Sequence, residues 1–384
     1  MCDRGGNAAR YGTVRKAHPT EMAVVGAEVA KRRPSKSVHR IKFDVIAQSK
    51  LGPFSDHFPH YAGGVVRSDP GGFVMSQEFG RNAHEFFYFQ PRKDDVWILT
   101  FPKCGTTWTQ ELVWMVVNNC NAEAARNSPL FIRSPFLESI LAQENFFSFH
   151  DPKRASRIAS LQSAPPEVHV LVPKVEVIEK STSPRVIKSH LPFSLLHSQL
   201  LETSKVVYVV RNPKDVIVSY YCHHKLFHRH GFLGDADLFA EYFMNDEVYY
   251  SPFFPHVLDA WSKRHHPNML FLFYEDLRKN VREGVIEIAR FLKKPLTERQ
   301  LTGLCQYLDL KSFASNELTN FEIVAKGIGL AKPEQHFPRK DGNGERESRE
   351  KVFSPEMSRR IDEWIEANLK ETDLRFAIES DPQF

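Results

Sequence analysis

The residues from Pro102 to Trp108 have the composition of a loop that binds an anion. They read P-K-C-G-T-T-W and follow a buried apolar run, Val96–Phe101, and the pattern predicts a helix that begins near Thr106. The first turn of a helix presents unpaired N–H groups and a partial positive charge, a glycine lets the backbone approach a ligand, and a lysine adds a full charge. The alternative interpretation is an ordinary helix start with Thr106 or Thr107 as its N-cap.

The order of residues in this loop differs from that of a nucleoside-triphosphatase loop. That motif is G-x-x-x-x-G-K-[ST], with its lysine after the second glycine. Here Lys103 precedes Gly105, and Thr100 stands where the motif has its upstream glycine. The segment therefore predicts a phosphate-binding loop of another kind. Trp108, just inside the predicted helix, either packs in the core or stacks on a purine.

A second apolar run is directly followed by an arginine. Val206–Val210 is followed by Arg211, Asn212 and Pro213, and proline is typical of the first position of a helix. Arginine suits a phosphate because its planar guanidinium donates two parallel hydrogen bonds. Ser219 follows Arg211 by about two helical turns. A surface Arg-Asn turn is the alternative for this segment taken alone.

A third run, Arg185–Lys188, has a lysine and a histidine at its end. Lys188 ends the run and His190 lies two residues further on. The pKa of an unperturbed histidine suits a general base near neutral pH, although a single histidine is more often structural. In open parallel sheets, ligands bind at the carboxyl ends of the strands, so these segments are expected to form one site.

Three later segments complete the set. Tyr274 ends the apolar run Leu270–Tyr274, and the dipeptide Ser312-Phe313 and the polar segment Phe337–Glu345 follow it. Taken alone, the tyrosine is an ordinary strand terminus and the polar segment is an ordinary surface loop.

The elements that must position these residues alternate between strands and helices. Four apolar, β-branched runs, already named, alternate with helical patterns, which predicts a single α/β domain with a central parallel sheet flanked by helices. The predicted helices are Thr106–Asn118, one that follows Pro213, and the amphipathic segment Val281–Leu292. The stretch 121–184, rich in Pro, Ser and Phe, is expected on the substrate side of the cleft.

The charge of the chain is concentrated at one end. The net charge of the 384 residues is +4, but residues 1–43 alone carry ten Lys and Arg against three Asp and Glu. The remainder is slightly acidic, which argues against a nucleic-acid-binding domain. We expect a disordered basic tail over residues 1–40 and the domain over residues 41–384.

The cysteines and the hydropathy indicate a cytoplasmic protein. The five cysteines are scattered and form no C-x-x-C pair, which disfavours a disulfide framework or a zinc site. No apolar run approaches the ~20 residues of a membrane span. Four histidines could be weighed as metal ligands, two of them on one helix face, but no matching carboxylate set accompanies them: His223, His224, His228 and His230.

Together and in this order, the five motifs resemble those of the cytosolic sulfotransferases. The loop P-K-C-G-T-T-W resembles the family's 5′-phosphosulfate loop. The segment R-N-P-K-D with Ser219 resembles its 3′-phosphate site, and K-S-H-L-P resembles the element that holds its catalytic base. The resemblance covers roughly residues 40–380 and implies a strand–loop–helix like that of P-loop kinases.

The resemblance implies transfer of a sulfuryl group from 3′-phosphoadenosine 5′-phosphosulfate (PAPS) to a hydroxyl or amine of a small acceptor, without a metal. It implies His190 as general base, with Lys103, Lys188 and Ser219 as the other catalytic residues. The donor-binding residues that it implies are Lys103, Cys104, Gly105, Thr106, Thr107, Trp108, Arg211, Ser219, Tyr274, Ser312, Phe313, Arg339 and Lys340.

Two departures from the family keep alternatives open. Asp341 stands where the family has glycine and Arg346 where it has tryptophan, and a carboxylate repels a phosphate. A non-catalytic nucleotide-binding relative is therefore one alternative. A small-molecule kinase is another, but it should carry lysine after the glycine and a carboxylate that binds magnesium.

The acceptor and the oligomeric state are less defined by the sequence. Five phenylalanines could line an apolar pocket for a phenol, a steroid or another alcohol, or could belong to the core: Phe131, Phe136, Phe146, Phe147 and Phe149. Homodimer formation is left open: the family's short dimer motif would fall near the C-terminal end of the domain, and it is not recognisable in this sequence.

Overall fold

The computed structural model describes residues 41–46, 56–59, 61, 64–138, 175–228, 230–309 and 352–376, with 313, 316, 319, 326, 331 and 332. These residues belong to one compact unit, Ile41–Phe384. The predicted tail lies outside the described residues, so the division into tail and domain stays a prediction.

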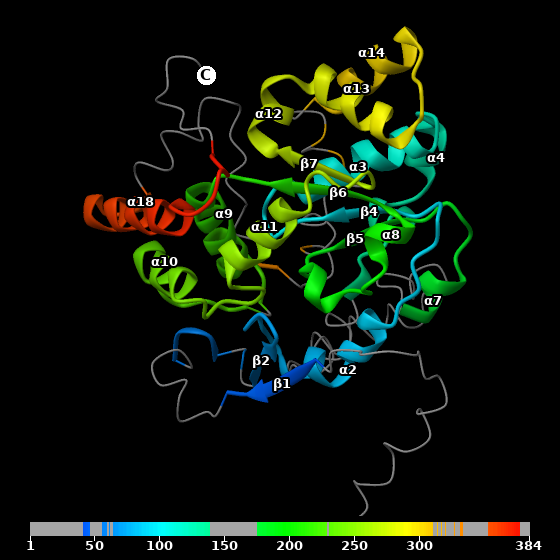
Figure 1. The fold of residues 1–384 in the computed structure, drawn as a ribbon. Coiled ribbons are helices and arrows are strands. Elements are labelled where there is room, and N and C mark those ends of the chain that lie inside the picture. The colour runs from blue at the N-terminus through cyan, green and yellow to red at the C-terminus, as the bar shows by residue number, and fades with distance from the viewer. Residues whose placement is uncertain are drawn as a thin grey trace, which may run out of the picture. The chain divides into compact units, whose positions relative to one another are not determined.

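A four-stranded parallel sheet lies at the centre of this unit, in the order β5-β4-β6-β7 (Figure 1). Each strand overlaps the apolar run predicted for it, so the predicted α/β fold with a central parallel sheet is confirmed. The strands are β4 Val96–Leu99, β5 Val186–Ser189, β6 Lys205–Val210 and β7 Met269–Phe273.

Both faces of the sheet are covered by helices. Trp97 and Leu99 of β4 belong to one core, and Val96 and Ile98 belong to the other. The first core includes residues of α9 Pro213–Leu226, α10 Ala236–Met244, α11 Phe253–Ser262 and α18 Pro355–Leu369. The second includes residues of α3 Thr106–Val117, α13 Val281–Leu292 and α14 Glu298–Tyr307. Because both faces are buried, the strands are apolar throughout rather than alternating.

The strand order places a ligand site at the carboxyl end of β4. The chain runs from β4 to β5 on one side and then crosses to β6 on the other. The loops that follow β4 and its neighbours therefore diverge around the end of β4. In open α/β sheets this switch point is where ligands bind.

A small antiparallel sheet precedes the central sheet, and its pairing was not predicted from the sequence. Its order is β1-β2-β3, and its strands are β1 Lys42–Val45, β2 Val65–Asp69 and β3 Val74–Ser76. Strands this short carry too few residues for a clear alternation of polar and apolar side chains. The remaining elements are α2 Gln77–Phe87, α4 Ala122–Asn127, α5 Leu130–Arg133, α7 Val175–Lys180, η5 Phe193–Leu195, α8 Leu200–Thr203 and α12 Tyr274–Lys279.

None of the helices in the described part of the chain combines the length and the apolar character that a membrane span requires.

A buried ion pair joins the starts of β4 and β5. The carboxylate of Asp95 accepts hydrogen bonds from Arg185 Nε at 2.7 Å and Nη2 at 2.5 Å, and from the backbone N–H of Arg92 at 2.7 Å. Both charged side chains of the pair are almost fully buried. The pair therefore fixes the amino ends of two strands whose carboxyl ends carry the site.

We expect Asp95→Ala to lower the free energy of unfolding by about 3 kcal/mol or more, because it leaves the Arg185 charge buried without its partner. Asp94 is exposed and serves as the matched control, with a change for Asp94→Ala within about 0.5 kcal/mol. Urea unfolding of both variants measures the difference. Equal losses in the two proteins would contradict the structural role of the pair.

Candidate active site

The loop after β4 leads into a helix whose first turn has no capping side chain. The N-cap of α3 is Gly105, with φ 83°, and no side-chain oxygen accepts from the first turn. The interpretation with Thr106 or Thr107 as N-cap is therefore wrong, since both lie inside the helix. Lys103 also has a positive φ, 72°, which is strained for a residue with a side chain. The strained turn aims the positive end of α3 at the carboxyl edge of the sheet.

Tyr274 packs directly on this loop. It is the first residue of α12, immediately after β7. A Cβ atom added at Gly105 would lie 2.2 Å from Tyr274 Cδ2, so a side chain there would clash with the ring. The guanidinium of Arg211 lies 4.9 Å from the centroid of the same ring. The loops after β4, β6 and β7 therefore meet, as the sequence analysis expected.

Arg211 follows β6 and is held by groups from both sides. Its Nη1 donates to the carbonyl of Lys103 at 3.4 Å, and its Nε lies 3.8 Å from Asp215 Oδ2. The next backbone N–H, that of Asn212, donates to Glu275 Oε1 at 2.8 Å. Burial raises the pKa of Glu275. These contacts fix the turn that presents the arginine beside the β4 loop.

His190 is a buried, neutral imidazole with a defined tautomer. Its Nδ1 lies 3.0 Å from the carbonyl oxygen of Thr100. A carbonyl can only accept, so Nδ1 carries the proton and Nε2 carries the lone pair. Burial lowers the pKa of His190 well below its usual value, and the charge of Lys188 lowers it further. Among the described residues nothing bonds to Nε2, so the geometry suits a base.

Lys188 and Glu138 form a coupled pair of charges beside this histidine. Burial lowers the pKa of Lys188 to about 8, and the Glu138 carboxylate opposes that shift. Burial raises the pKa of Glu138 to about 7. Glu138 Oε1 also accepts the backbone N–H of His190 at 2.5 Å. Both groups therefore titrate closer to neutral pH than they would in water.

A second buried histidine supports the first. His256 Nε2 donates to the carbonyl of His190 at 3.0 Å, and the hydroxyl of Tyr208 lies 2.8 Å from His256 Nδ1. Burial lowers the pKa of His256 to about 4, so it is neutral at physiological pH. The main chain of His190 is thus held by Glu138 on its N–H and by His256 on its carbonyl.

Aromatic side chains surround the candidate base. The ring of Phe136 lies edge-on to His190 at a centroid distance of 5.2 Å, and Tyr250 lies edge-on at 5.7 Å. Lys188 Nζ lies 4.5 Å from the Phe136 centroid. The surroundings of His190 are therefore apolar on the side of Phe136. The predicted pocket residues Phe146, Phe147 and Phe149 lie outside the described residues.

Two predicted donor-loop residues are turned into the protein. The thiol of Cys104 is fully buried in the core, and burial raises its pKa. The ring of Trp108 is buried, and its Nε1 donates to the carbonyl of Leu308 at 3.0 Å. Phe313 belongs to the same apolar core as Trp108. Lys103, Gly105 and Thr107, by contrast, are partly exposed.

Of the remaining predicted residues, one is described by the structure. Ser219 lies on α9 and is partly exposed, and its hydroxyl has no hydrogen-bond partner among the described residues. Ser312, Arg339 and Lys340 lie outside the described residues, as do Asp341 and Arg346.

The four histidines weighed as metal ligands do not form a metal site in the part of the chain that the structure describes. His224 is fully buried, and its Nε2 lies 3.0 Å from the hydroxyl of Tyr61. Its Nδ1 donates to the carbonyl of Tyr220 at 2.9 Å. His228 lies beyond the end of α9 at Leu226, so these two histidines do not share a helix face as the spacing suggested.

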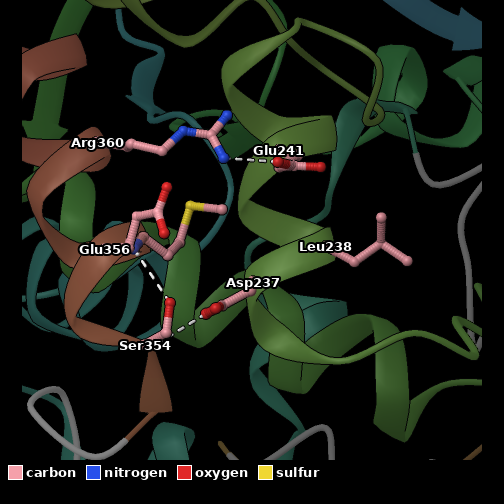
Figure 2. A pocket seen from close by; sticks show the side chains of 7 residues that line it. Asp237, Leu238, Glu241, Ser354, Glu356 and Arg360 are labelled. Atoms are coloured by element: carbon pink, nitrogen blue, oxygen red, sulfur yellow. Dashed lines mark hydrogen bonds and ion pairs between the residues drawn. The ribbon is translucent and has the colours of Figure 1, made fainter.

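A surface hollow of about 270 Å³ between α10 and α18 contains none of the predicted site residues (Figure 2). Arg360 pairs with Glu241 at 2.7 Å, and the backbone N–H of Ser354 donates to Asp237 at 3.0 Å. With Glu356 also on its wall, the hollow is rich in carboxylates and unsuited to an anionic ligand.

Several residues of the site were not assigned from the sequence. They are Thr100, Glu138, Tyr250, His256 and Glu275. Glu138, Tyr250 and His256 lie outside the five motifs, and Glu275 lies in a motif but had no role assigned to it. The signal of Thr100, Glu138 and His256 is burial of a polar side chain, and that of Tyr250 and Glu275 is a contact with a site segment; only the structure reveals either.

The chain matches the model of the sulfotransferase domain over residues 93–373, more than half of its length. It belongs to the sulfotransferase family. The family, the fold class and the sulfotransferase activity predicted from the sequence are thereby confirmed, and the small-molecule kinase alternative loses its support.

Two relatives and one solved structure illustrate the similarity. Human sulfotransferase 1E1 is 30% identical over 309 residues, which cover 80% of this chain and 95% of that protein. Rat sulfotransferase 1A1 is 31% identical over 80% of this chain and 96% of its own length. A crystal structure of retinol dehydratase with retinol and PAP is 30% identical, with a TM-score of 0.77, and the match covers 88% of this chain and 99% of that one.

We expect Gly105→Ala to lower the free energy of unfolding by about 2 kcal/mol, because alanine is strained at this φ and its Cβ meets Tyr274. Adding Tyr274→Ala should recover part of the loss, since the ring is then absent. Gly303→Ala on α14 is the control. A Cβ there meets nothing within 4 Å, so we expect no loss. Similar losses at both glycines in thermal unfolding would contradict the packing of Tyr274 on the loop.

Proposed function

We propose that this sulfotransferase moves the sulfuryl group of PAPS to a hydroxyl or amine of a small, apolar acceptor, with His190 as the general base. The observation that carries the proposal is the lone pair on His190 Nε2, fixed by the Nδ1 contact to Thr100 at the end of β4. A base with a defined lone pair thus lies at the edge of an anion-binding loop.

The donor fits the charges at the switch point. The uncapped first turn of α3, with Gly105, Thr106 and Thr107, and the side chain of Lys103 would bind the 5′-phosphosulfate. Arg211 and Ser219 would bind the 3′-phosphate, together with Arg339 and Lys340, which remain predictions from the sequence. Trp108, Tyr274, Ser312 and Phe313 would surround the adenine. The PAP molecule in the retinol dehydratase structure supports this choice of donor.

The chemical step then needs one proton transfer and one in-line displacement. His190 Nε2 takes the proton of the acceptor hydroxyl, whose oxygen forms the new bond to sulfur. The bond between sulfur and the 5′-phosphate oxygen breaks, and Lys103 neutralises the charge that gathers on that oxygen. Lys188 neutralises the sulfuryl oxygens. As in phosphoryl transfer, positioning and charge neutralisation supply most of the acceleration.

The acceptor is expected to be an apolar alcohol. Phe136 and Tyr250 pack against His190, so an acceptor that reaches Nε2 passes aromatic rings. Solved structures of retinol dehydratase hold retinol or androsterone. A panel of a phenol, a steroid alcohol and retinol with labelled PAPS tests the class. Mass spectrometry of the retinol reaction separates a sulfate ester from a dehydrated product. Cytoplasmic location stays a prediction from the sequence, and dimer formation stays open.

Calorimetric titration with PAP and with ATP tests the nucleotide. Binding of PAP together with turnover supports the proposal. Binding of PAP without turnover of any acceptor would favour the non-catalytic relative, and preference for ATP would favour a kinase.

We expect His190→Ala to lower the transfer rate by about 10²- to 10⁴-fold, because the acceptor loses its general base. Its affinity for PAP should stay close to that of the wild type, since the donor site is intact. His265 is exposed, and His265→Ala is the control with wild-type activity. Wild-type turnover in His190→Ala would exclude this base.

The pH profile of kcat/KM should fall on the alkaline side with a pKa near 8, because Lys188 then loses its charge. Glu138→Gln removes the carboxylate that helps Lys188 to keep its proton, so the pKa of Lys188 falls and the alkaline limb moves to lower pH. Glu287 is exposed on α13, and Glu287→Gln is the control. An alkaline limb that does not move in Glu138→Gln would argue against Lys188 as its source.

A further inference from the structure

The hydroxyl of Thr100 lies between the candidate base and the donor loop. Thr100 directly follows β4 and is fully buried. Its Oγ1 lies 2.6 Å from the Oγ1 of Thr106, in the first turn of α3, and 3.1 Å from Nδ1 of His190. Its carbonyl accepts from the same nitrogen at 3.0 Å. One residue therefore contacts both halves of the site.

The tautomer of His190 and the burial of Thr100 together give these hydrogen bonds a direction. Because Nδ1 of His190 carries its proton toward Thr100, the Thr100 hydroxyl can only accept from that nitrogen. Thr100 is fully buried, and among the described residues the acceptor within reach of its hydroxyl proton is Thr106 Oγ1 at 2.6 Å, so we take Thr100 as the donor of that bond. Once Thr106 accepts that proton, its hydroxyl hydrogen must point elsewhere, away from Thr100. We take its acceptor to be an anion bound at the uncapped first turn of α3, where Thr106 lies.

We propose that the Thr100 hydroxyl is a positioning group with two effects. It orients the hydroxyl proton of Thr106 toward the donor, and it holds the ring of His190 in place beside the donor loop. This inference rests on the proposed function, in which Thr106 binds the 5′-phosphosulfate and His190 is the base. Thr100 touches neither the donor nor the acceptor in this scheme. It acts through the two residues that do, and the main chain of Thr100 keeps the histidine tautomer even when the hydroxyl is removed.

The strand pairing explains why this residue can serve both sides. Leu99 pairs with Ser189 across β4 and β5, and the backbone N–H of Thr100 continues that pairing by donating to Ser189 at 3.3 Å. Thr100 therefore lies beside His190 in the parallel register. The turn that follows brings the chain back so that Thr106, six residues later, meets the same hydroxyl.

Thr100→Val removes the hydroxyl and keeps the shape of the side chain. We expect its kcat to fall about tenfold, the factor given by loss of one hydrogen bond of ordinary strength. Thr100→Ser restores the hydroxyl and should stay within about twofold of the wild type. Thr109 is equally buried, and its hydroxyl donates to the carbonyl of Gly105, so Thr109→Val is the matched control with little change.

A double-mutant cycle separates this role from a packing role. Calorimetry with PAP is carried out on the wild type, Thr100→Val, Thr106→Val and the double variant. Because Thr100 is inferred to act on the donor through Thr106, Thr100→Val should weaken PAP binding about threefold in the wild type and leave it unchanged in Thr106→Val. If the two substitutions instead weaken PAP binding independently, so that the double variant shows the product of the two single effects, the inference is overturned.

The outcomes distinguish this inference from the proposed function. If the wild-type protein binds PAP and transfers sulfate, and the kcat of Thr100→Val lies within twofold of the wild-type kcat, the role of Thr100 alone is overturned. Thr100→Ser as slow as Thr100→Val overturns it too, since the methyl group would then be what matters. Wild-type protein that binds no PAP overturns the proposed function and this inference together.

Discussion

The parallel pairing of β4 with β5 and β6 is the constraint on which the site depends. Leu99 at the end of β4 pairs with Ser189 on one side and with Tyr208 on the other. That register brings the residues after β4 level with His190 and near the turn that carries Arg211. A shift of one residue would turn these side chains to the opposite face. The two apolar cores that cover the sheet therefore also fix the site geometry.

Burial gives the site its electrostatic character. Around His190 the structure gathers a lysine, a carboxyl group and a second histidine, and desolvation is the largest influence on the pKa of each. Glu138 binds the main chain of His190 and also opposes the loss of the Lys188 charge. The proposed mechanism uses this pair of a neutral base and a cation, since one group would take a proton and the other would face an anion.

The fold could be predicted because its signals are local. Four apolar runs gave the strands of the central sheet, and the helices after Pro102 and Pro213 followed from turn and start signals. The pairing of the antiparallel sheet at residues 42–76 was not predicted, because its strands of three to five residues show little alternation and do not form the long apolar runs that mark the central sheet. The N-cap of α3 was missed because Gly105 adopts a left-handed backbone that no side-chain pattern announces.

The sequence by itself determined the family, the order of the motifs and the identity of Lys103, Lys188, His190 and Arg211 as candidate residues. Each of these lies at the end of a strand or just after it, so its segment carries the information. Only the tertiary structure decided which groups support them. Thr100, Glu138, His256 and Glu275 contact the site segments from positions far away in the chain. A single sequence without pairing information does not contain those contacts, because they arise from the register of the strands and from burial.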